Sequence, residues 1–399
     1  MYTSQADGTE SLAGFAEELF GHLNRADQRR WAETYLHGLL TAPGKKSIQE
    51  LARAVSRSRT ASHSLQQFIN QSPWDWGPAR HALTRWVTAR TPVRAWVADL
   101  AVIPKRGDHS VGVHRRFVPE HGRTINCQVG VGLFAATAAG AVPVDWRILL
   151  SGPWSEDERR RRTRVPPEAR CRPSWADVLD LVDELTASGV AVPDVPVLAD
   201  LRTTGDGGKL VSRLAARGAD FLVEVGPTQP VAVAPGDAAA RGGAARGPGP
   251  WLPARELVRE GMTHPYAMSV CEGGRERRLH VVTRLVHLPG PRPAASVHRL
   301  FAQWSPADRT PPRFWITGRA ERRPSELVAL LRLFQGTGTA LEELAGTFGL
   351  LDFEGRSFPG WHHHMTLVSA AYAISRPGLA GRDAALGPAG EAGGTLLTR

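Results

Sequence analysis

The chain has 399 residues and a formal net charge of +10, from 49 lysines and arginines against 39 aspartates and glutamates. Hydrophobic residues make up 42% of the sequence, which is enough for a buried core and excludes a wholly disordered protein. The longest apolar stretch, residues 129–144, is interrupted by glycines and a proline, so we expect no membrane-spanning helix. The first ten residues lack the basic and apolar segments of a secretory signal, and we expect a cytoplasmic protein.

Cysteine spacing and net charge indicate the compartment of the protein and the kind of partner it has. Cys127, Cys171 and Cys271 are far apart and form no disulfide or metal-binding pattern, which fits a reducing compartment. A sequence pI of about 10.3 favours a polyanionic partner such as nucleic acid. A GC-rich genome produces the same arginine-rich composition without any binding function, so composition alone leaves DNA binding open.

Residues 11–90 predict an N-terminal helical unit, because apolar side chains recur along them at helical spacing. Within this unit, Ser47 followed by Glu50 is typical of a capping box at the start of a helix. The pattern changes at residue 93, where short runs rich in valine and isoleucine predict buried strands. We expect a mixed α/β arrangement, with strands at 93–103, 126–134, 142–150, 195–199 and 221–225 and helices at 175–188 and 208–217.

The second half of the chain begins with a stretch rich in glycine, alanine and proline, residues 226–255, which predicts a loop. Alternating patterns over residues 262–320 predict further strands. Residues 324–350 are helical in pattern at both ends, but Gly336 and Gly338 make their middle a poor helix former. A last helix is predicted at 363–374, and residues 376–399 predict a disordered tail.

Two aspartates stand out by their position in this pattern. Asp99 lies within a buried apolar strand, and Asp200 directly follows another. A buried carboxylate is unfavourable unless it is paired, hydrogen-bonded or bound to a metal ion. Two carboxylates on adjacent strands can hold Mg²⁺ ions that assist phosphodiester chemistry. The alternative is that each aspartate caps the turn after its strand.

Several long segments then follow one another in a recognisable order. They read YLHGLLTAPGKKSIQELA, WVADLAVIPKRGDHSVGVHRRF, VPVDWRILLSGPW and LDFEGRSFPGWHHHMTLVSAAYA. Together they resemble bacterial DDE transposases of the insertion sequence 701 family, also called DDE superfamily endonucleases. The resemblance implies an α/β fold with an RNase H-like core, an N-terminal helical domain and a β-rich insertion.

The resemblance also implies a division of the chain into functional parts. Residues 1–90 would form an N-terminal helical, DNA-binding domain, and the core would comprise residues 91–225 and 324–375. The Gly/Pro-rich loop and β-rich insertion would occupy residues 226–323, and the tail residues 376–399. Such proteins cleave DNA at the ends of an insertion sequence and join those ends to target DNA.

Carried over residue by residue, the resemblance makes Asp99 and Asp200 catalytic, metal-binding aspartates for Mg²⁺ or Mn²⁺. The residues expected to contact DNA are Lys105, Arg106, His109, Arg115 and Arg116. The partners implied are double-stranded DNA, both terminal inverted repeats and target, and a second copy of the chain in a homodimer.

The third catalytic acid of the family is missing from its expected position. Counting back from Glu354 places it on Gly338, and anchoring on Arg332 places it on Gly336. Three explanations are open. Glu342 or Glu343, one turn further along the helix, has taken over the role. Alternatively the chain is a decaying transposase copy, or it is a repurposed relative that serves as an inactive DNA-binding or regulatory protein or performs small-molecule chemistry.

Overall fold

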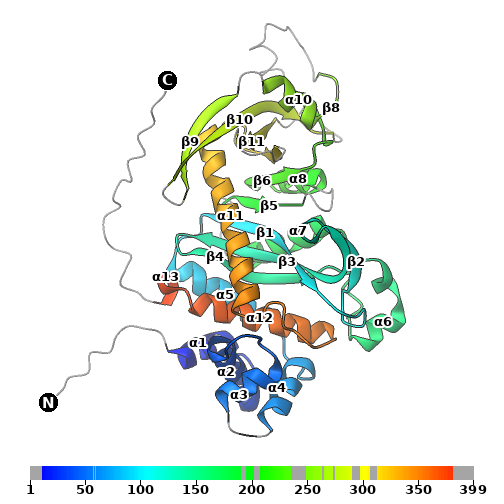
Figure 1. Cartoon of the computed structure of the whole chain (residues 1–399), viewed down its shortest axis with the longest axis vertical. Helices are drawn as coiled ribbons and strands as arrows, with labels where there is room; N and C mark the ends of the chain where they lie inside the picture. The colour runs from blue at the N-terminus through cyan, green and yellow to red at the C-terminus, as the bar shows by residue number, and fades with distance from the viewer. Residues whose placement is uncertain are drawn as a thin grey trace, which may run out of the picture.

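The computed structural model describes residues 11–56, 58, 60–189, 195–201, 207–234, 249–262, 265–272, 275–289, 297–305 and 312–380. The predicted tail beyond residue 380, residues 235–248 of the Gly/Pro-rich stretch and the segment directly after Leu201 lie outside these ranges. Figure 1 shows the N-terminal helices at one end of an elongated molecule and a large mixed sheet along the rest of it. Within the described ranges, no helix has the length and apolar character needed to cross a membrane.

The N-terminal helices share a core with the C-terminal helix. They are α1 (Leu12–Phe20), α2 (Ala26–Thr41), α3 (Ile48–Val55), α4 (Ala61–Asn70) and α5 (Gly77–Arg90), and α12 (Phe358–Ile374) packs against α2, α4 and α5. Ser47 caps α3 by accepting a hydrogen bond from the backbone N–H of Glu50, which confirms the predicted helix start. The helical unit is therefore fixed to the rest of the chain through α12, which is buried along nearly its whole length.

The centre of the sheet combines an antiparallel and a parallel part. Strands β1 (Ala95–Pro104), β3 (Arg123–Thr137) and β4 (Gly140–Ile148) are antiparallel, and β2 (His114–Val118), which the sequence pattern missed, pairs with the first part of β3. Strands β5 (Val197–Ala199) and β6 (Phe221–Val225) run parallel to β1. When β2 is left aside, the other five strands lie in the order β4-β3-β1-β5-β6.

The strands expected in the insertion extend this same sheet. Next to β6 come β12 (Arg313–Thr317), β11 (His298–Trp304), β10 (Arg275–His287), β7 (Pro230–Val233) and β8 (Leu252–Pro253), with β9 (Tyr266–Glu272) on the other part of β10. Helix α10 (Ala254–Gly261) packs on β10 and was not predicted. Because β12 pairs antiparallel with β6, the β-rich segment and the core form one continuous sheet over the described residues.

Helices cover both faces of the sheet. Helix α7 (Ser174–Ala187) and α12 lie on opposite faces of β4, because Arg147 contacts α7 while its neighbour Trp146 donates a hydrogen bond to Ser369 of α12. Helix α8 (Gly207–Ala216) packs on β6. The smaller helices are α6 (Asp157–Arg162) and α13 (Pro377–Ala380), and the latter occupies the start of the segment predicted as a disordered tail.

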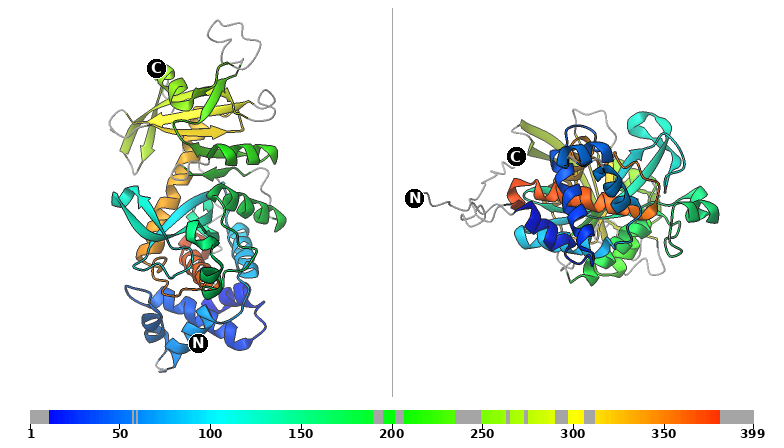
Figure 2. Two further views of the ribbon diagram at one scale, coloured as in Figure 1. Left: turned by 90° about the vertical axis from the view of Figure 1, so that its right-hand side faces the viewer. Right: turned by 90° about the horizontal axis from the view of Figure 1, so that it is seen from below.

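Helix α11 (Pro324–Gly346) is a single unbroken helix along the sheet, as Figures 1 and 2 show. The predicted weak middle at Gly336 and Gly338 was therefore wrong. The reason is tertiary packing: a face of α11 that includes Leu331, Phe334 and Ala340 is buried, and burial of such a face outweighs the low helix propensity of glycine. This helix brings its middle turns over β1, β3 and β4.

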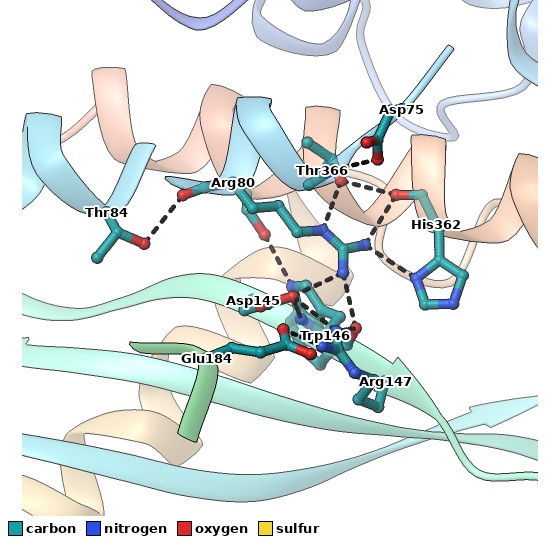
Figure 3. A network of polar contacts seen from close by, with 11 residues as sticks. Asp75, Arg80, Thr84, Asp145, Trp146, Arg147, Glu184, His362 and Thr366 are labelled. Atoms are coloured by element: carbon teal, nitrogen blue, oxygen red, sulfur yellow. Dashed lines mark hydrogen bonds and ion pairs between the residues drawn. The ribbon is translucent and has the colours of Figure 1, made fainter. Parts of the chain in front are cut away.

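A buried arginine joins the N-terminal helices to the core (Figure 3). Arg80 of α5 is 2% exposed, and its guanidinium donates hydrogen bonds to Asp145 of β4 at 2.7 Å and to Thr366 of α12 at 2.8 Å. It also donates to the carbonyl oxygen of His362 at 3.0 Å. Burial lowers the pKa of Arg80 to about 10 against the opposing charge of Asp145, so the group remains a cation at neutral pH.

Candidate functional site

Asp99 and Asp200 lie next to each other on the sheet. Strands β1 and β5 are parallel, with Ala98 paired to Ala199, so Asp99 is the next residue of β1 and Asp200 directly follows the end of β5. Neighbouring strands are about 4.8 Å apart and residues in register point to the same face. The charge of Asp200 accordingly raises the pKa of Asp99. The sequence prediction that these two carboxylates meet on adjacent strands is consistent with this register.

A third carboxylate, Glu224, continues the same row. Strand β6 pairs parallel with β5, with Ala199 opposite Val223, which places Glu224 beside Asp200 on the same face. The Glu224 side chain is 3% exposed. We refer to Asp99, Asp200 and Glu224 as the acidic row. Sequence reasoning missed Glu224, although a glutamate inside the apolar run FLVEV is the same signal that identified Asp99.

Arg313 is bound to two members of the acidic row. It lies on β12, two residues before Trp315, which pairs with Glu224. Its Nε donates to Oε1 of Glu224 at 2.9 Å, and its Nη2 donates to Oδ2 of Asp200 at 2.8 Å and contacts Oε2 of Glu224. Although burial opposes the charged form, the hydrogen bond and charge of Glu224, with the charges of Asp200 and Asp99, raise the pKa of Arg313. The guanidinium also lies over the Trp315 ring, 4.9 Å from its centroid.

Helix α11 places a threonine on Asp99. The Oγ1 of Thr337 lies 2.7 Å from Oδ2 of Asp99 and also 2.7 Å from the carbonyl oxygen of Phe334. A hydroxyl group donates only one hydrogen, so both contacts are satisfied together when Asp99 carries a proton. Burial, together with the charge of Asp200, raises the pKa of Asp99 to about 6, against the opposing effect of the hydrogen bonds from Thr337 and the Leu100 N–H.

The glycines at the expected acid positions flank this threonine. Gly338 is exposed, and a Cβ added to it would have no other atom within 4 Å. At Gly336 the nearest atom to an added Cβ would be the Ala141 Cβ at 3.9 Å. A longer side chain would therefore fit at either position, so packing does not explain the missing acid.

The two glutamates proposed as substitutes point elsewhere. Glu342 is exposed, five residues and therefore about 7.5 Å along the helix axis from Thr337. Glu343 accepts a hydrogen bond from the Tyr372 hydroxyl at 3.0 Å and forms an ion pair with Arg376 at 2.8 Å. Across the described ranges, no three histidines, cysteines, aspartates or glutamates come together in a group that could hold a metal ion.

Three of the residues expected to contact DNA line one shallow cavity of about 370 Å³. Arg106 and His109 are exposed there, in a loop after β1. Lys105 instead turns inward, and its Nζ donates to the carbonyl oxygen of Phe353 at 2.7 Å. Burial lowers the pKa of Lys105 to about 8, against the charges of Asp352 and Glu354.

The other two expected DNA contacts, Arg115 and Arg116, lie on the edge strand β2, where Arg115 is exposed. The basic run on α6 is largely paired within the protein. Three of its four arginines form ion pairs with Glu156, Glu158 or Asp108, such as Arg161 with Glu158 at 2.8 Å. The fourth, Arg160, donates hydrogen bonds to backbone carbonyl oxygens. This helix therefore offers less free positive charge than its sequence indicates.

A larger cavity of about 580 Å³ opens beside the acidic row, between α11 and strands of the extended sheet. Glu224 and Arg313 line it, together with Arg277, Arg332 and Gln335. Its walls thus combine apolar and basic side chains with one carboxylate of the acidic row.

Comparison with protein-family models identifies the family of the chain. The family model described as DDE superfamily endonuclease matches residues 18–288, which is about two thirds of the chain. The matched span includes the whole acidic row and ends before β12 and α11. No curated protein matches the chain.

Proposed function

The chain belongs to the DDE superfamily endonuclease family, and on that premise we propose that it is a transposase-type protein of the insertion sequence 701 group whose own DNA cleavage is impaired. In this proposal the protein binds double-stranded DNA at terminal inverted repeats. Phosphodiester cleavage and strand transfer are weak or lost because the third catalytic acid has been replaced by glycine.

The sheet topology supports an RNase H-like core. In the order β4-β3-β1-β5-β6, the first three strands are antiparallel and the last two run parallel to β1. We assign residues 91–225 and 324–375 to this core, residues 226–323 to an insertion, and residues 1–90 to a DNA-binding domain. Two such chains in a homodimer would hold the two ends of one element.

A single observation carries the proposed impairment: α11 presents Thr337, and not a carboxylate, to Asp99. Nucleases of this superfamily generally use divalent metal ions, which are held by several carboxylates. Here Asp99 and Asp200 are adjacent, but Asp200 is bound to Arg313, and the described residues contain no group of three or more suitable ligands. The residues present do not fit such a metal site, so we derive no step through a metal ion.

Binding of DNA rests on the exposed basic side chains. Arg106 and His109 lie together beside β1, Arg115 lies on the edge strand β2, and the chain as a whole carries a net charge of +10. Contacts between such side chains and phosphates release counterions and give binding that weakens steeply with salt. This function does not require the missing acid.

A second candidate is an active nuclease that works with two acids. The adjacency of Asp99 and Asp200 on one face of the sheet favours it, because this is where the resemblance places the first two catalytic aspartates. In that case Mg²⁺ or Mn²⁺ would be required, and both aspartates would be essential.

One experiment separates the two candidates. Double-stranded DNA carrying the sequences that flank the gene is incubated with the protein and Mg²⁺ or Mn²⁺, and both nicking and salt-dependent binding are measured. We expect salt-sensitive binding that persists in Asp99→Asn and Asp200→Asn, without nicking. Nicking that both variants lose would instead establish the active nuclease, and the absence of both binding and nicking would remove the DNA function.

A further inference from the structure

We infer that Arg313 is a built-in counter-ion that takes the place of a bound divalent cation in the acidic row. The inference deepens the proposed function and rests on its assignment of Asp99 and Asp200 as the former metal-binding carboxylates. It adds a physical mechanism for the loss of metal-dependent cleavage. It also predicts that the acidic row regains a cation when the charge of Arg313 is removed.

The geometry of the guanidinium supports this role. Arg313 donates from Nε to one oxygen of Glu224 and from Nη2 to Oδ2 of Asp200, so it bridges two carboxylates on neighbouring strands. A divalent ion shared by the same two carboxylates would bind the same oxygens. Cation and guanidinium would then be a few ångströms apart with like charge, which is unfavourable in a partly buried site.

The arginine is held firmly in this position. Its backbone belongs to β12, where it pairs with Gln303 of β11, and Phe314 next to it pairs with Val225 of β6. Its guanidinium lies over the rings of Trp315 and Phe334, 4.9 Å and 5.8 Å from their centroids. Planar stacking combined with a bridging fork is specific to arginine, and lysine would retain only the charge.

The way in which the carboxylates of the acidic row are bound also supports the counter-ion role of Arg313. Two of these carboxylates are bound by Arg313, whereas Asp99 is bound by the Thr337 hydroxyl and by the Leu100 N–H. Loss of the Arg313 charge would leave three carboxylates side by side on β1, β5 and β6. Asp200 and Glu224 would then be two adjacent carboxylates without the opposing guanidinium, and Mg²⁺ or Mn²⁺ can be held by one or two carboxylates together with water molecules.

The test measures metal binding by the full chain without DNA. Mn²⁺ is titrated by calorimetry, and Tb³⁺ by its luminescence, which the nearby Trp315 can sensitise. The variants are Arg313→Gln, Arg313→Lys, Asp200→Asn and the double variant Arg313→Gln/Asp200→Asn. Arg332→Gln is a matched control from the same cavity. Circular dichroism and a cooperative melting transition verify that each variant is folded.

We expect Arg313→Gln to bind Mn²⁺ at least tenfold more tightly than the wild type, and the double variant to lose this gain. Arg313→Lys and Arg332→Gln should behave like the wild type. The inference is overturned if the folded Arg313→Gln variant shows no gain. It is equally overturned if the wild type binds Mn²⁺ in a way that Asp200→Asn abolishes, a result that depends on no Arg313 variant.

These outcomes are separable from those of the proposed function. If the wild type binds Mn²⁺ through Asp200 but does not nick DNA, the counter-ion role fails and the proposed function stands. If the wild type binds neither metal nor DNA and Arg313→Gln gains Mn²⁺, the counter-ion role stands and the DNA function fails.

Discussion

Replacing Asp99 by asparagine should stabilise the protein at neutral pH. Burial raises the pKa of Asp99 from 3.8 to about 6, which means that the folded state disfavours its ionised form. A carboxyl group whose pKa is raised by folding contributes stability that is fully present below its pKa in the unfolded chain. This contribution is lost as the pH rises through its pKa in the folded protein. Asparagine is neutral at every pH and avoids this loss.

The magnitude follows from the size of the shift. Each pKa unit corresponds to about 1.4 kcal/mol, so the free energy of unfolding of Asp99→Asn should exceed that of the wild type by about 3 kcal/mol at pH 8. The difference should grow between about pH 4 and pH 6 and remain nearly constant above. The substitution preserves the local hydrogen bonds, because the new amide can donate to Thr337 while Thr337 donates to the Phe334 carbonyl.

Urea denaturation at several pH values measures this difference, and Asp145→Asn is the matched control. Although burial opposes ionisation there too, the charges of Arg147 and Arg80 lower the pKa of Asp145. Its replacement should therefore destabilise the protein at pH 8, with the opposite sign. An Asp99→Asn variant that is no more stable than the wild type at pH 8, or whose stability difference does not change with pH, would refute the reasoning.

Three further predictions concern other parts of the structure. Gly338→Ala should raise the free energy of unfolding by about 0.5–1 kcal/mol in urea denaturation, because the new methyl group meets no atom and alanine favours the helix; a destabilised variant would contradict this. Arg80→Met should lower the free energy of unfolding by about 3 kcal/mol or more, since it leaves a buried carboxylate unpaired; a change below 1 kcal/mol would show that the network is dispensable. Fluorescence anisotropy measures how the DNA-binding constant falls with salt, and Arg106→Ala should reduce the slope of its logarithm against log salt concentration by about 0.9. Lys105→Ala should leave that slope unchanged, because the Lys105 ammonium is bound to a carbonyl oxygen of the protein. Equal effects of the two substitutions would refute the distinction.

Local elements of this fold could be predicted from the sequence because their patterns are local. The buried strands at β1 and β6 and the start of α3 at Ser47 follow from apolar runs and capping residues within a few positions. The continuity of α11 could not be predicted in the same way. Its glycines favour a break, and only the packing of the helix on distant strands keeps it intact.

The site was predictable only in part, for a related reason. Asp99 and Asp200 could be identified because each stands out within its own strand. Arg313 could not, since it lies 113 residues from Asp200 and reaches it only because β12 pairs with β6. The register of that pairing also decides on which face of the sheet the Arg313 side chain lies. A shift of one residue would turn it away from Asp200 and Glu224.

In the proposed function, the glycines on α11 and Arg313 on β12 together set the charge of the acidic row. Both lie beyond residue 288, where the family match ends, and both act on the acidic row that lies within it. In that proposal the glycines on α11 add no negative charge to the row, and Arg313 on β12 supplies a positive one. This positive charge compensates the row, because unpaired buried carboxylates are destabilising. On this reasoning, a chain that had only lost its third acid would keep a partly formed metal site, whereas the inferred counter-ion role of Arg313 places the protein's own cation there.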